Sequence, residues 1–433
     1  MQIRRAESIR YFRLKLVPFH SPNENMSTLT DTTFAKAWLK NFALDDRETA
    51  ILLLDRLMLV GASTFKSGLI ALLDAVPRTK GREQPHIAIY AEREVAKTDH
   101  TVKPFFPGSA TGRAVGDGIP PVDVDPSKQD VGSEGEIAAL ISKYCKLPDR
   151  LAVSHPGPDL LRTNQVKSIV IVTDFIGSGR RIGEMLDAFA RVASIQSWIS
   201  YGLLDFHVVC YSGTEYGVWS VERHSLRPIV SSHIACPVVE EAFHGSELGA
   251  VKLLCKSYPK PRNRFPFGFN NTGSLIAFSH GIPNNAPALF HSTAGGWKPL
   301  FAGRSTLASG LDLIASDNEL IAQNSERVLK LRNARRVLRD SEGEEWTQSM
   351  LVLDAINRGG RTVTKLSALS QLPISVVKEM IALLKIAGWV TSQTRLTRLG
   401  RRELQSARRM GLVNDDIVFP VSGPYFPTQL RAP

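Results

Sequence analysis

Asp174 is the carboxylate best placed to do chemistry, because it stands just after a strongly apolar run. The run, Ile169–Val172, has four β-branched residues, which are typical of a strand buried on both faces. Ligands of open α/β sheets bind at the carboxyl ends of the strands. We therefore expect Asp174 to accept hydrogen bonds from sugar hydroxyls or to support a metal.

A glycine-rich turn follows. Gly177, Ser178 and Gly179 separate the expected strand from a helix that starts near Ile182. Two glycines let the backbone approach a ligand closely and point successive N–H groups at one place. The helix N-terminus adds partial positive charge. The turn is predicted to bind a phosphate, although a bare strand–turn–helix junction has the same glycines.

Two arginines, Arg180 and Arg181, come directly after the turn. Guanidinium groups bind phosphate through charge-assisted hydrogen bonds. We expect both side chains to reinforce the anion site.

Several other chemistries have no support in the sequence. The four cysteines form no CxxC pair and the ten histidines form no HExxH pattern, so a zinc ribbon and a metalloprotease are not expected. Neither GxSxG nor the P-loop pattern occurs. No metal held by the protein is predicted. The cysteines are scattered and we find no signal peptide, which predicts a cytoplasmic protein. No apolar run has the length of a membrane span, so we expect no membrane partner.

Apolar runs and helical segments alternate around the turn. Strands are predicted at 86–90, 169–172, 205–213, 227–236 and 275–279. Helical spacing occurs at 33–60, where Asp45 and Asp46 resemble N-caps, from Ser63 or Thr64 to Val76, and at 134–146, and a long loop is expected at 96–132. This alternation predicts an α/β fold with a mostly parallel sheet.

The strand and turn resemble the signature of the phosphoribosyltransferase superfamily, which implies the type I-like fold of that family. By this resemblance, the residues Gly177–Arg181 hold the 5-phosphate of phosphoribosyl pyrophosphate, Asp174 faces the ribose hydroxyls, and Mg2+ chelates the diphosphate. Two positions depart from the pattern: Thr173 replaces the first acidic residue, and Arg181 replaces the last hydroxyl residue of the loop.

A second segment, 278–304, resembles the end of a divergent bacterial branch of that superfamily found in conflict systems. The residues that carry the resemblance are His280, Pro283, Asn284, Asn285, Trp297, Pro299, Leu300, Phe301 and Arg304. The resemblance gives no role to them. Without it, Pro283–Asn285 is a turn and Trp297 is a packed anchor.

The diphosphate loop is left open between two candidates. One is Ala91–Glu94, which follows the 86–90 strand, and the other is Gly132-Ser133, which precedes the 134–146 helix. A polar loop and a helix N-cap explain the same residues.

The last fifth of the chain is basic and helical. Of the 53 Lys and Arg and 42 Asp and Glu that give a net charge of +11, 12 basic and five acidic residues lie after residue 345. Three helices and a short strand pair predict a winged helix-turn-helix, whose basic face suits nucleic acid. The expected contact residues are Ser375, Lys378 and Lys385 on the third helix, with Arg395 and Arg398 near the wing. A winged helix used for protein contacts is the alternative.

Together these patterns predict an N-terminal extension (1–32), a phosphoribosyltransferase-like domain (33–304), a helical linker (305–345), a winged helix (346–410) and a Pro-rich tail (411–433). This pairing resembles the toxic effector of retrons, which are bacterial anti-phage systems. In those systems, a reverse transcriptase and its multicopy single-stranded DNA restrain the effector, so both are implied partners. The alternatives are a catalytically inactive, nucleotide-sensing transcription regulator and a salvage enzyme with an added domain.

Overall fold

The computed structural model describes residues 29–78, 86–99, 101–120, 132–259, 264–304, 325 and 341–412. The predicted extension before residue 29, almost all of the predicted linker before residue 341 and the Pro-rich tail after residue 412 lie outside these residues.

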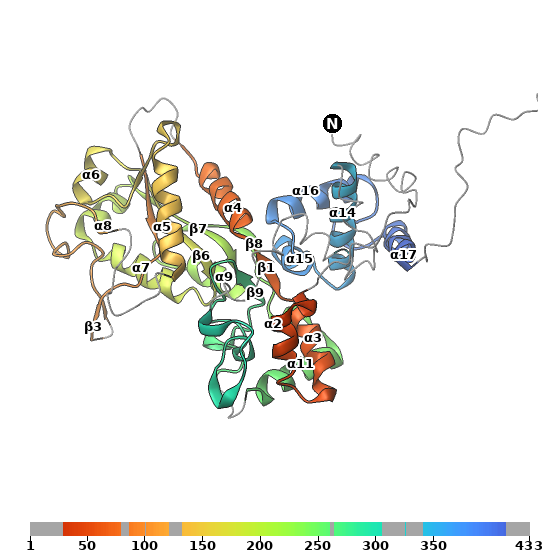
Figure 1. Ribbon diagram of the computed structural model, residues 1–433. Helices are drawn as coiled ribbons and strands as arrows, with labels where there is room; N and C mark the ends of the chain where they lie inside the picture. Colours follow the sequence, from red (N-terminus) through yellow and green to blue (C-terminus); the bar gives the residue numbers. More distant parts are fainter. Residues whose placement is uncertain are drawn as a thin grey trace, which may run out of the picture. The chain divides into compact units, whose positions relative to one another are not determined.

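A five-stranded parallel sheet forms the centre of the α/β domain (Figure 1). Its strands lie in the order β5-β2-β6-β7-β8, and each neighbouring pair is parallel. The strands are β2 (Ile87–Ala91), β5 (Ala152–Ser154), β6 (Ser168–Ile176), β7 (Asp205–Gly213) and β8 (Ile229–Ala235). The predicted mostly parallel sheet is confirmed. Ranked by position in the chain, the strand order is 2-1-3-4-5, so it reverses between β2 and β6.

Helices cover both faces of this sheet. The side chains of β6 alternate between the two sides: Val170 and Val172 belong to one core, and Ile169 and Ile171 to the other, all fully buried. The first core includes residues of α4 (Ala62–Ala75) and α5 (Gly132–Cys145). The second includes residues of α6 (Pro158–Thr163), α7 (Arg180–Ala190), α8 (Ala193–Ser200) and α9 (Glu215–Glu222).

A separate two-stranded parallel sheet pairs β1 (Met58–Val60) with β9 (Ile276–Phe278). The helical reading of 33–60 is therefore wrong at its end, where Met58–Val60 forms a strand. The apolar residues of β1 find a partner strand far along the chain, which local periodicity cannot reveal. The strand predicted at 275–279 exists as β9, but it lies outside the five-stranded sheet.

The β1–β9 sheet contributes to a third core. Around it pack α2 (Thr33–Leu39), α3 (Arg47–Asp55) and α11 (Gly245–Ser257), and α10 (Val239–Ala242) adds two buried residues. The large side chains Trp38, Phe290 and Phe301 are fully buried in it.

The helix starts differ from the sequence prediction in two places. Helix α4 begins at Ala62 with Gly61 as its N-cap, so Ser63 and Thr64 lie inside its first turn. Asp46 occupies the N-cap of α3 without a capping hydrogen bond. Its Oδ2 instead accepts from the Tyr258 hydroxyl at 2.8 Å, a long-range bond that the local pattern does not show.

The segment predicted as a long loop at 96–132 contains a small antiparallel hairpin. Its strands are β3 (Lys97–Thr98) and β4 (Thr101–Val102). Residues 121–131 lie outside the described part of the chain.

The C-terminal region contains four described helices, α14 (Ser341–Asn357), α15 (Val363–Ser370), α16 (Ile374–Ile386) and α17 (Arg398–Leu412). Helices α15 and α16 meet at 106°, within the range of a helix-turn-helix. The predicted strand pair of the wing is a single antiparallel bridge between Val390 and Leu396. Thr397 caps α17, since its Oγ1 accepts from Gly400 N at 3.1 Å.

The chain divides into two compact units. One contains the described residues of 29–304 and Gly360–Lys378, and the other contains residue 325 and the described residues 341–359 and 379–412. In the second unit, the carboxylate of Asp354 on α14 is buried and pairs with Arg358 and with Arg408 of α17.

Helix α15 belongs to the unit that contains the sheet. Residues Leu366–Ser370 are all buried, and the Ala235 amide on β8 donates to Ser367 Oγ at 3.1 Å. Gln371 Nε2 also donates to the Arg56 carbonyl at 3.2 Å. Because β8 is an edge strand, the Ser367 hydroxyl satisfies an amide that the sheet itself leaves unpaired.

Candidate ligand site

The carboxyl ends of β2 and β6 lie side by side at the point where the strand order reverses. Ala91 pairs with Val172, so the next residues, Glu92 and Thr173, are neighbours. The Thr173 hydroxyl donates to Glu92 Oε2 at 2.5 Å, and both side chains are buried. Thr173, which stands at the first acidic position of the resembled signature, thus brings a carboxylate from the adjacent strand to the same place.

Glu92 has an unusual electrostatic environment. Burial raises its pKa to about 7, while the Arg181 guanidinium and the Thr173 hydrogen bond oppose the rise. Arg181 Nε lies 2.9 Å from Glu92 Oε1. Because its pKa lies near neutrality, Glu92 can take up or release a proton there.

Arg181 has two carboxylate partners that the sequence did not lead us to expect. Its guanidinium pairs with Glu92 and with Glu134, a first-turn residue of α5. Burial lowers the pKa of Arg181, but the carboxylates of Glu92 and Glu134 outweigh this and raise it overall. The expected contact of Arg181 with a phosphate stays a prediction, and α5 and the end of β2 supply its carboxylate partners in this structure. A phosphate at the turn would compete with both carboxylates for this side chain.

Asp174 is paired with a histidine from a distant part of the chain. His280 follows β9, and its Nε2 lies 3.1 Å from Asp174 Oδ2. The His280 ring stacks on Phe278, and its Nδ1 is buried without a hydrogen-bond partner among the described residues. An unpaired buried nitrogen costs about 1–3 kcal/mol, and a catalytic role is one of the explanations for such a cost.

The turn itself is closely packed on one side. A side chain at Gly177 would place its Cβ 2.3 Å from Asn285 Oδ1, and one at Gly217 of α9 would meet the Gly177 carbonyl at 2.3 Å. Gly179, with φ of 77°, is the N-cap of α7 and lies in the left-handed region that favours glycine. The glycines are therefore required by close approach at Gly177 and by backbone conformation at Gly179.

The N–H groups of the turn are not consumed by this packing. Among the described residues, the amides of Gly177, Ser178 and Gly179 donate to no acceptor, and the Arg180 amide makes one long contact, 3.4 Å, with Ser178 Oγ. The Arg180 side chain is 62% exposed, with Nε 3.4 Å from Glu184 Oε1 and its guanidinium over the Phe269 ring. The turn thus offers free donors at the start of an 11-residue helix, α7.

The other residues of the resembled C-terminal segment have separate roles. Asn285 is buried against Gly177, and its Nδ2 donates to the Phe269 carbonyl at 3.2 Å and to Thr272 Oγ1 at 3.0 Å. Asn284 is exposed and accepts from Phe269 N through its backbone carbonyl. The structure therefore brings His280 and Asn285 to the candidate site.

Trp297 and Arg304 are not brought to the site by any contact among the described residues. Trp297 is buried in the third core, where its Nε1 donates to the Leu289 carbonyl at 2.9 Å. It is the packed anchor of the simpler interpretation. Arg304 is exposed, and its backbone carbonyl accepts from Ile282 N.

The choice between the two candidates for the diphosphate loop stays open. The segment Ala91–Glu94 contains Glu92, whose buried carboxylate is unfavourable next to a diphosphate. Gly132-Ser133 forms the start of α5, the helix that supplies Glu134 to Arg181.

Two family models match the chain. One, described as PRTase-CE, matches residues 35–302, and the other, described as wHTH-PRTase associated, matches residues 350–432. The chain belongs to the PRTase-CE family. No curated protein and no solved structure matched it. The predicted combination of a phosphoribosyltransferase-like domain with a winged helix is confirmed by these matches and by the parallel sheet.

The winged-helix residues of this PRTase-CE chain that were predicted to bind nucleic acid are exposed. Ser375, Lys378 and Lys385 lie on the exposed side of α16, whereas Val377 and Leu384 are buried. Arg395 and Arg398 are also exposed, on either side of the Thr397 cap.

The described residues of this PRTase-CE chain contain no group of three or more His, Cys, Asp or Glu side chains that could hold a metal ion. Within the same described part, no single helix has the length and apolar composition needed to cross a membrane, although α15 and α16 taken together pass that test as a bent pair. The four cysteines are free thiols, three of them buried.

Glu92 and Glu134 are the site residues that sequence reasoning missed as partners of Arg181. Glu92 carried a usable signal, because a carboxylate directly after a buried strand lies at the ligand-binding edge of a parallel sheet. Glu134 carried none, since an acidic residue in the first turn of a helix is ordinary.

Proposed function

We propose that this chain is an effector whose phosphoribosyltransferase-like domain binds and acts on a phosphoribosyl compound or nucleotide. The observation that carries the proposal is the turn Gly177–Gly179, whose amides have no partner in the part of the chain that the structure describes and which follows β6 beside Asp174. A phosphate group supplies the acceptors that these amides lack.

The neighbouring side chains support glycosyl transfer or cleavage of an N-glycosidic bond. In either reaction, the bond between the anomeric carbon and the leaving group breaks, and a bond from that carbon to the acceptor or to water forms. In this proposal, Asp174, whose Oδ2 lies 3.1 Å from His280 Nε2, accepts hydrogen bonds from the ribose hydroxyls. Glu92, with a pKa of about 7, is the candidate base for the proton released by the acceptor or by water. Mg2+ would enter the site already bound to the diphosphate of the substrate.

The resemblance described above supports a role as the toxic effector of a retron-type anti-phage system. In this proposal, the basic winged helix contacts the multicopy single-stranded DNA, its RNA or duplex DNA. A reverse transcriptase is then the partner that holds the effector in check. The match of both family models to one chain and the 12 basic against five acidic residues after residue 345 support this arrangement.

A nucleotide-sensing regulator without catalysis is the second candidate. The specific observation in its favour is Thr173, which replaces an acidic residue of the resembled signature. In this case, the turn would still bind a nucleotide, but no glycosidic bond would form or break.

Calorimetry with phosphoribosyl pyrophosphate and Mg2+ tests the ligand site. We expect the wild type to bind phosphoribosyl pyrophosphate and Asp174→Ala to bind it at least tenfold more weakly. The affinity of Arg181→Ala for the same ligand should differ from that of the wild type. Arg191→Ala is the matched control, because Arg191 is exposed at the opposite end of α7. Absence of heat with the wild type would count decisively against a phosphoribosyl pyrophosphate site.

Inducible expression in bacteria separates the two candidates. An enzyme effector should arrest growth without its restraining partners, and Asp174→Ala should relieve the arrest at equal protein levels. Growth arrest that Asp174→Ala leaves unchanged would exclude the catalytic role of this site in toxicity.

A further inference from the structure

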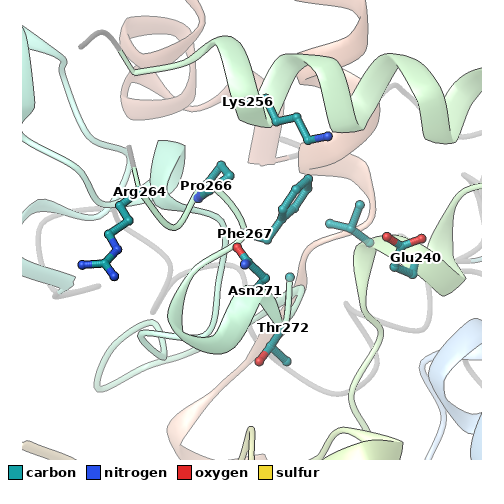
Figure 2. Close-up of a pocket in the computed structure, with 9 residues that line it drawn as sticks. Glu240, Lys256, Arg264, Pro266, Phe267, Asn271 and Thr272 are labelled. Atoms are coloured by element: carbon teal, nitrogen blue, oxygen red, sulfur yellow. The ribbon is translucent and has the colours of Figure 1, made fainter. Parts of the chain in front are cut away.

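A cavity lies next to α10 and α11, in the unit that also contains the turn. Its volume is about 650 Å³, within the range of small-molecule sites. Figure 2 shows its walls: Lys256 comes from the last turn of α11, Glu240 from α10, and Arg264, Phe267 and Thr272 from the segment before β9. None of these residues was singled out by the sequence.

The charge of the cavity favours an anion. Lys256 and Arg264 are both exposed and lie on different walls (Figure 2). The single acidic side chain of the lining, Glu240, is 2.6 Å from Lys252 Nζ, outside the lining. Its charge is therefore already balanced, and the two cations dominate.

The remaining lining suits a flat ring. The half-buried Phe267 ring presents an aromatic face, flanked by Pro266 and Val239. Asn271, in the left-handed conformation with φ of 50°, presents an exposed carboxamide that can donate and accept hydrogen bonds. A planar heterocycle joined to a phosphate matches both halves of the lining.

One side chain joins this cavity to the turn. Thr272 lines the cavity, and its Oγ1 accepts from Asn285 Nδ2 at 3.0 Å. On its other side, Asn285 Oδ1 packs directly on Gly177. A ligand that moves Thr272 therefore acts on the turn through a single buried residue.

We propose that this cavity is a second site, separate from the turn, which binds a mononucleotide and is coupled to the turn through Asn285. The coupling rests on the proposed function of the turn, whereas the binding does not. Coupling between two sites is reciprocal, so occupancy of the cavity changes the affinity of the turn for phosphoribosyl pyrophosphate, and the reverse.

Calorimetry of the full chain with AMP tests the binding, with adenosine and inorganic phosphate as ring-only and phosphate-only probes. We expect AMP to bind more tightly than either probe. Lys256→Glu and Arg264→Glu should each weaken the binding of AMP at least tenfold, because each replaces a cation of the lining with an anion that repels the phosphate. Both side chains are exposed, so neither change puts the folding of the chain at risk. Lys143→Ala, which changes an exposed lysine on α5, should bind AMP like the wild type.

Asp174→Ala separates this proposal from that for the turn, since it should leave AMP binding at the cavity intact. Asn285→Ala should keep AMP binding but abolish its effect on the affinity for phosphoribosyl pyrophosphate. The second site would be overturned if the wild type did not bind AMP. It would also be overturned if Asp174→Ala abolished AMP binding while Lys256→Glu and Arg264→Glu left it unchanged. An unchanged mutual effect in Asn285→Ala would overturn the coupling.

Discussion

The hydroxyl of Thr173 donates to Glu92 Oε2 at 2.5 Å, joining the ends of two neighbouring strands. The signature that this chain resembles has an acidic residue where Thr173 stands. A carboxylate is nevertheless present at that place, supplied by β2 and raised in pKa by burial. Where the resembled signature has an acidic residue on β6, this chain has Thr173, and the carboxylate comes instead from Glu92, directly after β2.

Glu92→Gln should remove a pH dependence of stability. The pKa of Glu92 is about 7 in the folded chain, above its ordinary value of 4.5, so the folded state binds more protons between these values. Wild-type stability should therefore fall as the pH rises from about 4.5 to 7, by at most about 3 kcal/mol. Thermal unfolding of both proteins across this range checks it. The melting temperature of Glu92→Gln relative to wild type should rise with pH, and a constant difference would contradict the assignment.

Gly177→Ala should destabilise the α/β domain. The new methyl group would overlap Asn285 Oδ1, so we expect a loss of about 1–3 kcal/mol in the free energy of unfolding. Gly183→Ala, one turn into α7, meets no atom within 4 Å and should stabilise by up to about 1 kcal/mol. Denaturant unfolding compares them. Equal effects at both glycines would show that the contact with Asn285 does not decide the result.

Ser367→Ala should loosen the edge of the sheet. The variant leaves the buried Ala235 amide without its acceptor, at a cost of about 1–3 kcal/mol. Hydrogen exchange should then be faster at the end of β8. Ser370→Ala is the control, because the Ser370 hydroxyl bonds within its own helix to the Leu366 carbonyl. Protection of β8 that survives Ser367→Ala would mean that α15 does not secure this edge.

Lys378→Ala, Arg395→Ala and Arg398→Ala should each weaken nucleic-acid binding. If each side chain contacts one phosphate, the slope of log affinity against log salt should fall by about 0.9 per variant for a duplex and about 0.7 for a single strand. Fluorescence anisotropy with labelled DNA at several salt concentrations measures this. Lys36→Ala, an exposed lysine on α2, should keep the wild-type slope. Unchanged slopes in all three variants would favour a winged helix that contacts protein.

The local pattern was enough to predict four of the five strands of the central sheet and the position of the turn, but it did not predict β5 (Ala152–Ser154). Ile169–Val172 had to form a buried strand because four β-branched apolar residues bury both faces, and the glycines after it predicted a tight turn. The helices of the winged helix followed from the same kind of short-range periodicity. These features depend on neighbours within a few residues, which the sequence displays directly.

Only the tertiary structure decided which groups meet at that turn. Arg181 was expected to face a phosphate, yet α5 and β2 bring two carboxylates to it, and β9 brings His280 to Asp174. Met58–Val60 became a strand because β9 offers it a partner. Each of these contacts joins residues that are far apart in the chain. Local spacing cannot predict such a contact, because it depends on how the strands and helices pack in three dimensions.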